Sequence, residues 1–209
     1  MSKPLVSAQV IKRLPRYYRF LGELERIGTV RISSRELSQK MGFTASQIRQ
    51  DLNCFGGFGQ QGYGYNVMEL RRAIGGILGI GASNPTVLIG AGNLGKALTV
   101  HMDFNKRGFK LIGIFDNDPQ ICNTEISGLP VMSIDMLEAF CDKSKPVCAI
   151  LCIPKIAAEK LVPCLIKCGI KAFWNFSHYD LRTTENVIVE NVHLSDSLMT
   201  LAYGLNNLE

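Results

Sequence analysis

The sequence lacks long apolar runs and paired cysteine motifs. No stretch approaches the roughly 18 uninterrupted apolar residues of a membrane-spanning helix. Residues 1–9 also lack the hydrophobic run of a signal peptide, so we expect a cytoplasmic chain with no membrane partner. The seven cysteines contain no C-x-x-C pair, which argues against a disulfide framework and a zinc knuckle. Most of them are expected to be small buried hydrophobic residues.

Acidic residues are scarce in the first part of the chain. Residues 1–80 contain 12 Lys or Arg against 5 Asp or Glu, whereas residues 81–209 contain 11 against 13. Only the first part is therefore suited to binding a polyanion. Basic residues that merely keep helix surfaces solvated would give the same counts. With 46% apolar residues, the chain can bury one large core or two small ones.

A segment rich in Gly, Ser, Asn and Pro, residues 79–85, separates a helical pattern from alternating strands and helices. We place the domain boundary there and expect domains at 1–80 and 81–192, followed by a C-terminal helix at 193–209. Before the boundary, residues 8–14 and 16–27 read as two helices, with Pro15 at their junction in a first helical turn.

The pattern over residues 33–55 is helix, glycine turn, helix. Ser33 and Ser34 can cap a first helix that Gly42 ends, and Thr44-Ala-Ser-Gln47 has the spacing of a capping box that opens a second helix. This is the layout of a helix-turn-helix unit, which also occurs in proteins that never bind DNA.

Helical periodicity gives the second helix two distinct faces. Its first turns present three polar side chains, Gln47, Arg49 and Gln50, while Ile48 and Leu52 face inward. Residues 55–65 follow with five glycines and four aromatics, which favour a tight hairpin, and residues 67–78 form a final helix. We interpret the hairpin as the wing of a winged helix.

Gly90, Gly92 and Gly95 form a G-x-G-x-x-G motif between an apolar strand and an apolar helix. A second strand, residues 110–116, ends in Asp116, where a ribose-binding acid is expected. Its carboxylate would repel a 2′-phosphate, and Asn117 and Asp118 follow rather than arginine, so NAD(H) is favoured over NADP(H). Asp116 could instead be a strand-end turn residue, and the motif could also bind another adenine ligand such as coenzyme A.

Strands and helices continue to alternate after residue 116. We expect helices at 134–141 and 156–168 and strands at 147–153 and 171–175, hence a parallel sheet with right-handed crossovers. A ligand of such a sheet lies past the carboxyl ends of the strands. The residues at those ends are candidates near the nicotinamide, with ordinary loop packing as the alternative: Cys152, Ile153, Pro154, Asn175, Phe176 and Ser177.

Near the C-terminus, Leu194, Leu198, Leu201 and Leu205 make one apolar stripe on a helix. The stripe can pack on its own sheet or on another subunit, and periodicity does not decide between the two.

Taken together, four segments strongly resemble the Rex family of redox-sensing transcriptional repressors: residues 34–51 with Gln47-Ile-Arg-Gln-Asp51, the wing Phe58-Gly-x-x-Gly-x-Gly-Tyr65, the Gly90–Gly95 motif, and Asn175-Phe176. The resemblance covers essentially the whole chain. It implies an α/β homodimer with N-terminal winged helices, C-terminal Rossmann-like parallel sheets and a terminal helix exchanged between subunits. It also implies a repressor that binds operator DNA with NAD⁺ and releases it with NADH.

The resemblance assigns roles to individual residues. Arg49 would read the major groove, and Gln60 and Gln61 at the wing tip would enter a minor groove. The predicted DNA contacts are Thr44, Ser46, Gln47, Arg49, Gln50, Gln60, Gln61 and Tyr63. The predicted NAD(H) contacts are Gly90, Ala91, Gly92, Asn93, Leu94, Gly95, Lys96, Asp116, Cys152, Pro154, Asn175 and Phe176.

Several positions depart from the family pattern. Gln50, Gln60 and Gln61 stand where many members carry Lys or Arg, so we expect an A·T-rich palindromic operator and a flatter salt dependence. Arg19 matches the family's coupling arginine, but His101 and His193 replace its tyrosine and acid. Because histidine titrates near neutrality, we expect the redox response to depend on pH.

Two other classes of function compete with this interpretation. One is a small NAD- or coenzyme A-binding enzyme subunit, but the chain after Pro85 leaves no room for a substrate domain, and no nucleophile and base pair is apparent. The other is a structural adaptor that binds nucleotide without DNA, which the basic N-terminal part disfavours. We therefore predict a protein that is not an enzyme, and in which no metal is involved.

Overall fold

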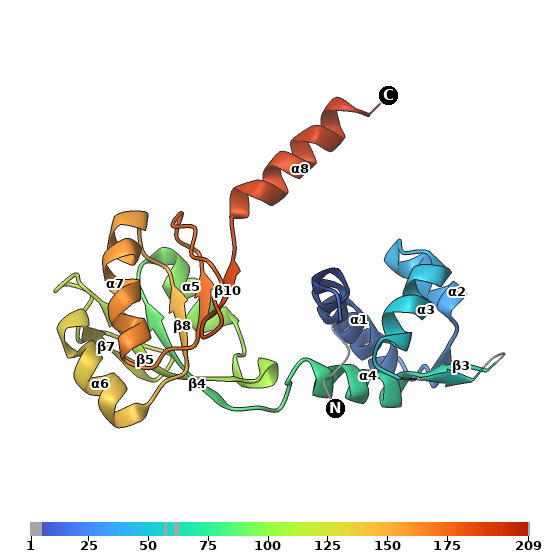
Figure 1. Ribbon diagram of the computed structural model, residues 1–209, viewed down its shortest axis with the longest axis horizontal. Helices are drawn as coiled ribbons and strands as arrows, with labels where there is room; N and C mark the ends of the chain where they lie inside the picture. The colour runs from blue at the N-terminus through green and yellow to red at the C-terminus, as the bar shows by residue number, and fades with distance from the viewer. Residues whose placement is uncertain (1–5, 57, 61–62, 209) are drawn as a thin grey trace. The chain divides into compact units, whose positions relative to one another are not determined.

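The computed structural model describes residues 6–56, 58–60 and 63–208 (Figure 1). The chain divides into two compact units, Met1–Gly81 and Ala82–Glu209. Each unit has a hydrophobic core of its own, which is the property that lets a domain fold independently.

In its described residues the N-terminal unit combines four helices with a small antiparallel sheet. Its helices are α1 (Ala8–Arg26), α2 (Ser34–Met41), α3 (Ala45–Asn53) and α4 (Val67–Ile77). Its strands lie in the order β1 (Arg31–Ile32), β3 (Gly64–Asn66), β2 (Gly59–Gln60), and both pairings are antiparallel. The predicted helix-turn-helix and the predicted hairpin are both present.

Residue Pro15 does not separate two helices, as predicted, but lies inside the single helix α1. A proline within a helix removes one backbone hydrogen bond and crowds the preceding turn. The helix continues because its buried face is uninterrupted, so packing outweighs the lost bond. The buried side chains on that face are Val10, Leu14, Tyr17, Leu21 and Leu24.

The caps of α2 and α3 differ. At α2 the Ser33 hydroxyl accepts from the Glu36 N–H at 3.1 Å and the Glu36 carboxylate accepts from the Ser33 N–H at 2.7 Å, which is a complete capping box. At α3 only half of the predicted box forms: Thr44 Oγ1 accepts from the Gln47 N–H at 3.1 Å. The Gln47 side chain instead donates to the carboxylate of Asp51, a charged and therefore stronger acceptor.

The C-terminal unit is built on a seven-stranded sheet in the order β10-β9-β8-β4-β5-β7-β6. All neighbours are parallel except β6 and β7. The strands are β4 (Asn84–Ile89), β5 (Phe109–Asp116), β6 (Glu125–Ile126), β7 (Leu129–Ser133), β8 (Cys148–Leu151), β9 (Ala172–Asn175) and β10 (Ile188–Asn191). The predicted α/β class with a Rossmann-like parallel sheet is confirmed.

Helices and 3-10 turns connect these strands. They are α5 (Asn93–His101), η1 (Asn105–Arg107), η2 (Ile134–Met136), α6 (Leu137–Ser144) and α7 (Lys155–Lys167), with α8 (Leu194–Asn206) after the last strand. Alternate residues of β4 point to opposite faces of the sheet: Val87 and Ile89 belong to the core under α6 and α7, and Leu88 belongs to the core on the other face.

Three strands of this sheet were not predicted. The short hairpin β6–β7 turns at Ser127 and Gly128, whose φ angles of 52° and 83° are those of a tight two-residue turn. Strand β10 lies at the edge of the sheet, pairs with β9 and is largely exposed, so its sequence carries little apolar alternation.

The cysteine prediction was largely wrong. Only Cys141 and Cys148 are buried, Cys54 is exposed, and the other four are half-buried; all seven are free. Three of the thiols outside the core lie at the ends of elements: Cys54 and Cys168 are helix C-caps, and Cys152 directly follows β8.

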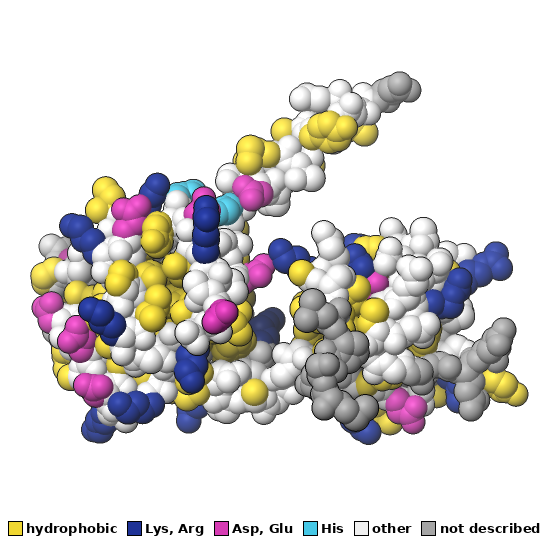
Figure 2. Space-filling view, viewed as in Figure 1, with side chains coloured by type: hydrophobic (Ala, Val, Ile, Leu, Met, Phe, Trp, Pro, Cys, Tyr) yellow, Lys and Arg dark blue, Asp and Glu magenta, His cyan; other side chains and the backbone are white. Residues whose placement is uncertain are grey.

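Helix α8 has no buried residue. Its apolar side chains, among them Leu194, Leu198, Leu201 and Leu205, are each more than half exposed, and Figure 2 shows them as hydrophobic patches along the helix. Among the described residues no helix is both long and apolar enough to cross a membrane.

Candidate functional site

The glycine loop between β4 and α5 is shaped by close backbone approach. Gly90 has a φ of +97°, and a Cβ there would lie 2.5 Å from the carbonyl oxygen of Cys152. A Cβ on Gly95 would overlap the carbonyl oxygen of Gly90. Both positions therefore require glycine for the strand, turn and helix to pack as they do.

At Gly92, in contrast, an added Cβ would meet no protein atom within 4 Å. Gly92 is the N-cap of α5, and no side chain caps that helix. The N–H groups of its first turn, Asn93, Leu94 and Gly95, are thus not used by a cap, while Lys96 donates back to the Gly92 carbonyl at 2.9 Å. An uncapped helix start beside open space suits a phosphate group.

The carboxylate of Asp116, at the end of β5, holds this loop in place. It accepts from the Ala91 N–H at 2.6 Å and from the Asp118 N–H at 2.9 Å, and the residue is 9% exposed. Each carboxylate oxygen has a further lone pair, so a ribose hydroxyl can still donate to it. The acid predicted from the sequence therefore lies directly at the glycine loop, and these residues fit a dinucleotide without a 2′-phosphate.

The other predicted nucleotide contacts lie at the carboxyl ends of β8 and β9. Cys152 follows β8, and its N–H donates to the carbonyl oxygen of Ile89 at 2.8 Å. This bond places Cys152 beside the glycine loop. Burial raises the pKa of its thiol to about 12, so the group stays protonated and acts as an apolar wall. Pro154 is the N-cap of α7, and Phe176 directly follows β9.

Asn175 is fully buried, and its amide is occupied by protein groups. Its Nδ2 donates to the Tyr179 carbonyl and to Asn191 Oδ1, both at 2.7 Å, and its Oδ1 accepts from the Ser177 hydroxyl at 2.6 Å. The amide thus ties β9 to β10 and to the loop between them. Asn191 and Tyr179 were not predicted, because the partners come from an unrecognised strand and an irregular loop. A role for Asn175 at the nicotinamide stays a prediction.

Helix α3, the second helix of the helix-turn-helix, presents a polar exposed face. Ser46, Arg49 and Gln50 are exposed, and Thr44 caps the helix. Arg49 Nη1 donates to Ser34 Oγ at 3.1 Å, which links α3 to the start of α2. The sequence pattern did not indicate this contact, since Ser34 was interpreted only as a helix cap.

The side of α3 that faces α1 holds a buried ionic network, which the half-buried Gln47 joins from the margin of the exposed face. Asp51 is 0% exposed, and its carboxylate accepts from Arg13 Nε at 2.6 Å, Arg13 Nη2 at 2.7 Å, Tyr17 Oη at 2.9 Å and Gln47 Nε2 at 2.9 Å. Burial opposes the ionised carboxylate, but these donors outweigh it, so the pKa of Asp51 is lowered. Burial and Asp51 together raise the pKa of Tyr17.

The wing is described only in part. Tyr63 is 69% exposed, and its carbonyl accepts from Arg31 Nη1 at 3.3 Å. Gln60 lies on β2, but the placement of its side chain falls outside the described structure, and Gln61 lies outside the described residues. Gly64, with a φ of +68°, allows β3 to approach β1, because a Cβ there would lie 2.6 Å from the Ile32 carbonyl oxygen.

The predicted coupling residues are distributed over both units. Arg19 is exposed on α1, and His101 is the exposed last residue of α5. His193 is the N-cap of α8; its ring stacks on His178 with centroids 6.1 Å apart, and its Nε2 lies 3.4 Å from Asp180 Oδ1. His178 and His193 are thus neighbours in space although they are distant in sequence.

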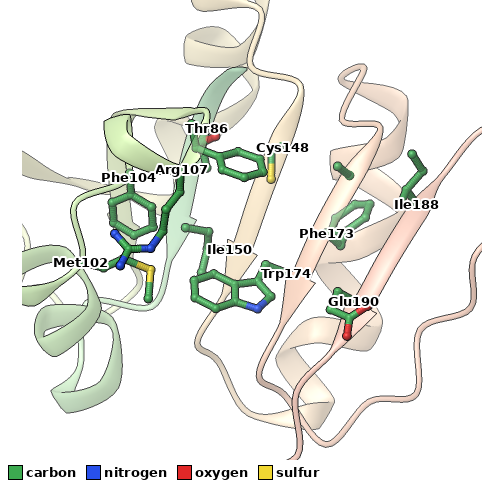
Figure 3. A pocket seen from close by; sticks show the side chains of 12 residues that line it. Thr86, Met102, Phe104, Arg107, Cys148, Ile150, Phe173, Trp174, Ile188 and Glu190 are labelled. Atoms are coloured by element: carbon green, nitrogen blue, oxygen red, sulfur yellow. The ribbon is translucent and has the colours of Figure 1, made fainter. Parts of the chain in front are cut away.

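An apolar cavity of about 380 Å³ lies on one face of the sheet (Figure 3). Its floor comes from the first residues of β8, β9 and β10, where Cys148, Ala172 and Ile188 lie, and Trp174 and Phe104 add aromatic surface. The dinucleotide site is expected at the other, carboxyl ends of the strands. The cavity is therefore distinct from the glycine loop. Within the described part of the chain, no cluster of His, Cys, Asp or Glu could hold a metal ion.

Two family models match the chain, one in each unit. Residues 5–53 match the model described as "Putative DNA-binding protein N-terminus". Residues 82–179 match the model described as "CoA binding domain".

Curated relatives are similar over nearly the full length. Two examples are the proteins named "Redox-sensing transcriptional repressor Rex" from Thermoanaerobacter sp. (strain X514), 55% identical over 99% of this chain and 92% of the relative, and from Clostridium perfringens (strain 13 / Type A), 51% identical over 97% and 95%. The protein of the same name from Clostridium acetobutylicum is 50% identical over 96% of this chain and 94% of its own length.

Solved structures are similar over the same span. "RSP in complex with beta-NAD+ and operator DNA" has a TM-score of 0.90 and 54% identity, covering 98% of this chain and 94% of that chain. "RSP in complex with beta-NADH" has a TM-score of 0.89 and 51% identity, covering 98% and 96%.

Proposed function

Because the chain belongs to the Rex family of redox-sensing transcriptional repressors, we propose that it binds operator DNA through its N-terminal unit and NAD(H) through its C-terminal unit. The protein binds its operator with NAD⁺ or without nucleotide and releases it with NADH. The observation that carries the proposal is the presence, in one chain, of a winged helix with an exposed polar recognition helix and a glycine loop closed by Asp116. The family consists of repressors, so the enzyme-subunit alternative is not supported.

The glycine loop supplies the nucleotide contacts. The first-turn N–H groups of α5 bind the pyrophosphate, and Asp116 accepts from a ribose hydroxyl. Cys152, Pro154 and Phe176 enclose the nicotinamide, and Asn175 holds the loop that carries Phe176. Since the nicotinamide is cationic in NAD⁺ and neutral in NADH, a buried thiol that stays uncharged offers the cationic form no compensating negative charge and so favours the neutral form.

The recognition helix and the wing supply the DNA contacts. Arg49 reads the major groove, while Gln60 and Gln61 of the wing enter a minor groove. Gln50, an exposed amide, faces an A·T base pair, since glutamine matches the N6 and N7 groups of adenine. With glutamines replacing cationic residues at these positions, fewer phosphate charges are neutralised and the salt dependence of binding is shallow.

A homodimer in the cytoplasm completes the proposal. Helix α8 buries none of its residues, although its stripe of leucines is apolar enough to form half of an interface. A second copy of the chain offers the matching apolar surface, namely the cavity over β8, β9 and β10. Two winged helices then face the two halves of a palindromic operator.

Nucleotide and DNA are coupled through Arg19, His101 and His193. The coupling is reciprocal. If NADH lowers the affinity for the operator by some factor, the operator lowers the affinity for NADH by the same factor, and the coupling free energy is typically about 1–3 kcal/mol. With histidines at two of these three coupling positions, the response to NADH changes between pH 6 and 8.

The proposal is tested by titrating a labelled A·T-rich palindrome with the full-length chain, alone, with NAD⁺ and with NADH. NADH is expected to release the duplex, whereas equal binding in all three conditions would contradict the sensor function. The variant Gly92→Ala sharpens the test, because its methyl group meets no protein atom but occupies the space of the pyrophosphate. It is expected to bind the duplex like the wild type and to ignore NADH.

A further inference from the structure

The amide of Gln47 is held by the buried carboxylate of Asp51. Gln47 lies in the first turn of α3 and is half-buried, and its Nε2 donates to Asp51 Oδ1 at 2.9 Å. Asp51 is itself held by two bonds from Arg13 and one from Tyr17, which connect α3 to α1. The acceptor for Gln47 is therefore fixed by three bonds that do not involve Gln47.

The chemistry of this contact determines which way the amide faces. An ionised carboxylate has only acceptor sites, and Asp51 stays ionised because its donors lower its pKa. Only the nitrogen of Gln47 can face it; the flipped amide would place two acceptors in contact. The orientation of a glutamine amide usually has to be inferred from its hydrogen-bond network. Here the negative charge of Asp51 determines it.

This arrangement leaves one donor and one acceptor of Gln47 available. Among the described residues, its Oε1 accepts no hydrogen bond and its second N–H donates none. A donor beside an acceptor on one amide is the pattern that adenine complements in the major groove with N7 and N6. The first turn of a recognition helix is also the part that reaches base edges.

Gln50 offers a useful contrast on the same helix. Its side chain is exposed and has no hydrogen bond with any described residue, so its amide is free to rotate and flip. A side chain that is already oriented loses less conformational freedom on binding than one that is free. Gln47 is thus better prepared than Gln50 to distinguish one base from the other three.

We propose that Gln47 specifies an adenine in each half of the operator, and that Asp51 is the positioning residue that orients it. The proposal rests on the proposed function, since it concerns how that DNA is read. Asp51 does not contact the bases; it acts through the Gln47 amide, and Arg13 acts through Asp51.

The test is selection of binding sites from a randomised duplex library by the wild type, Gln47→Met and the matched variant Gln50→Met. Methionine keeps the length of the side chain but has no amide, and both positions tolerate it because neither is buried. Gln47→Met is expected to lower the preference for adenine at one base pair per half-site by about 5- to 150-fold, the range of a bidentate contact. Gln50→Met is expected to leave that base pair unchanged and to alter another.

The variant Asp51→Asn tests the positioning role. Its amide can donate to Gln47 Oε1 as well as accept from Nε2, so the orientation of Gln47 is no longer enforced. The adenine preference is expected to weaken at the same base pair, while Asp51→Glu, which restores the carboxylate, recovers part of it. If Asp51→Asn does not fold, the Gln47 and Gln50 variants decide by themselves.

The outcomes separate the two proposals. A wild type that selects no palindrome refutes the repressor function and this inference together. A wild type that selects an operator, with Gln47→Met retaining the same preference at every base pair, refutes the inference and leaves the repressor function intact.

Discussion

Replacing Asp51 by alanine tests how the N-terminal unit is held together. The change leaves the Arg13 guanidinium, the Tyr17 hydroxyl and the Gln47 amide without their common acceptor. Removing one partner of a buried ion pair costs about 3–5 kcal/mol, and the cost is expected near the lower end here because the remaining Arg13 side chain is 22% exposed and water can partly solvate its charge. For a unit of the size of Met1–Gly81 this corresponds to a fall in Tm of at least about 12 °C.

The single tryptophan makes the measurement specific. Trp174 lies on β9 of the C-terminal unit, so its fluorescence reports that unit alone, whereas far-UV circular dichroism reports both. In thermal unfolding of full-length Asp51→Ala, the dichroism is expected to show an early transition that the fluorescence does not follow. Tyr17→Phe removes only one donor to Asp51, so the free energy of unfolding of the N-terminal unit is expected to fall by about 1.5 kcal/mol. Coincident wild-type and Asp51→Ala transitions would show that the network contributes little.

The same network predicts a dependence on acid. Since the pKa of Asp51 is lower in the folded chain than in the unfolded chain, its contribution is complete above the unfolded value, about 3.9, and is lost as pH falls through the folded value. The N-terminal unit of the wild type should therefore lose stability below about pH 4. Asparagine does not titrate, so the Asp51→Asn variant should lack this part of the stability loss in acid. If the stability of the variant falls with pH as that of the wild type does, Asp51 is not the group responsible.

Three further predictions concern the C-terminal unit. Leu198→Asp with Leu201→Asp should convert the dimer to a monomer in light scattering, whereas Thr200→Asp on the other side of α8 should not; a wild-type monomer would contradict the role of α8. Gly95→Val should abolish NADH binding in calorimetry and lower the Tm of this unit, because its Cβ would overlap the Gly90 carbonyl; retained binding would show that the loop adapts. His193→Asn should reduce the difference between operator release by NADH at pH 6 and at pH 8. Equal release by the wild type at both pH values would contradict the proposed pH dependence.

Local patterns in the sequence were sufficient for several features. The cap at Ser33, the turn at Gly42 and the cap at Thr44 predicted α2 and α3, because capping depends on residues only three or four positions apart. The glycines of the loop at Gly90 and the acid at Asp116 predicted a Rossmann-like unit for a similar reason, since each strand, turn and helix is continuous in sequence.

Features that depend on contacts between distant segments were not predicted. The periodicity broke at Pro15, yet packing of one continuous face keeps α1 a single helix. Strand β10 has little apolar alternation of its own and exists because β9 offers a free edge to pair with. The partners of Asn175 likewise come from residues up to 16 positions away.

By itself the sequence determined the order of the two units, the helix caps and the glycine turn, and, through its family resemblance, the kind of ligands to expect. Only the tertiary structure decided that Asp51 meets Arg13, 38 residues earlier, and that Gln47 therefore turns away from its own helix cap. The physical reason is that capping and turn preferences act over a few residues, whereas the environment of a buried charge is set by whichever segments the completed fold brings around it.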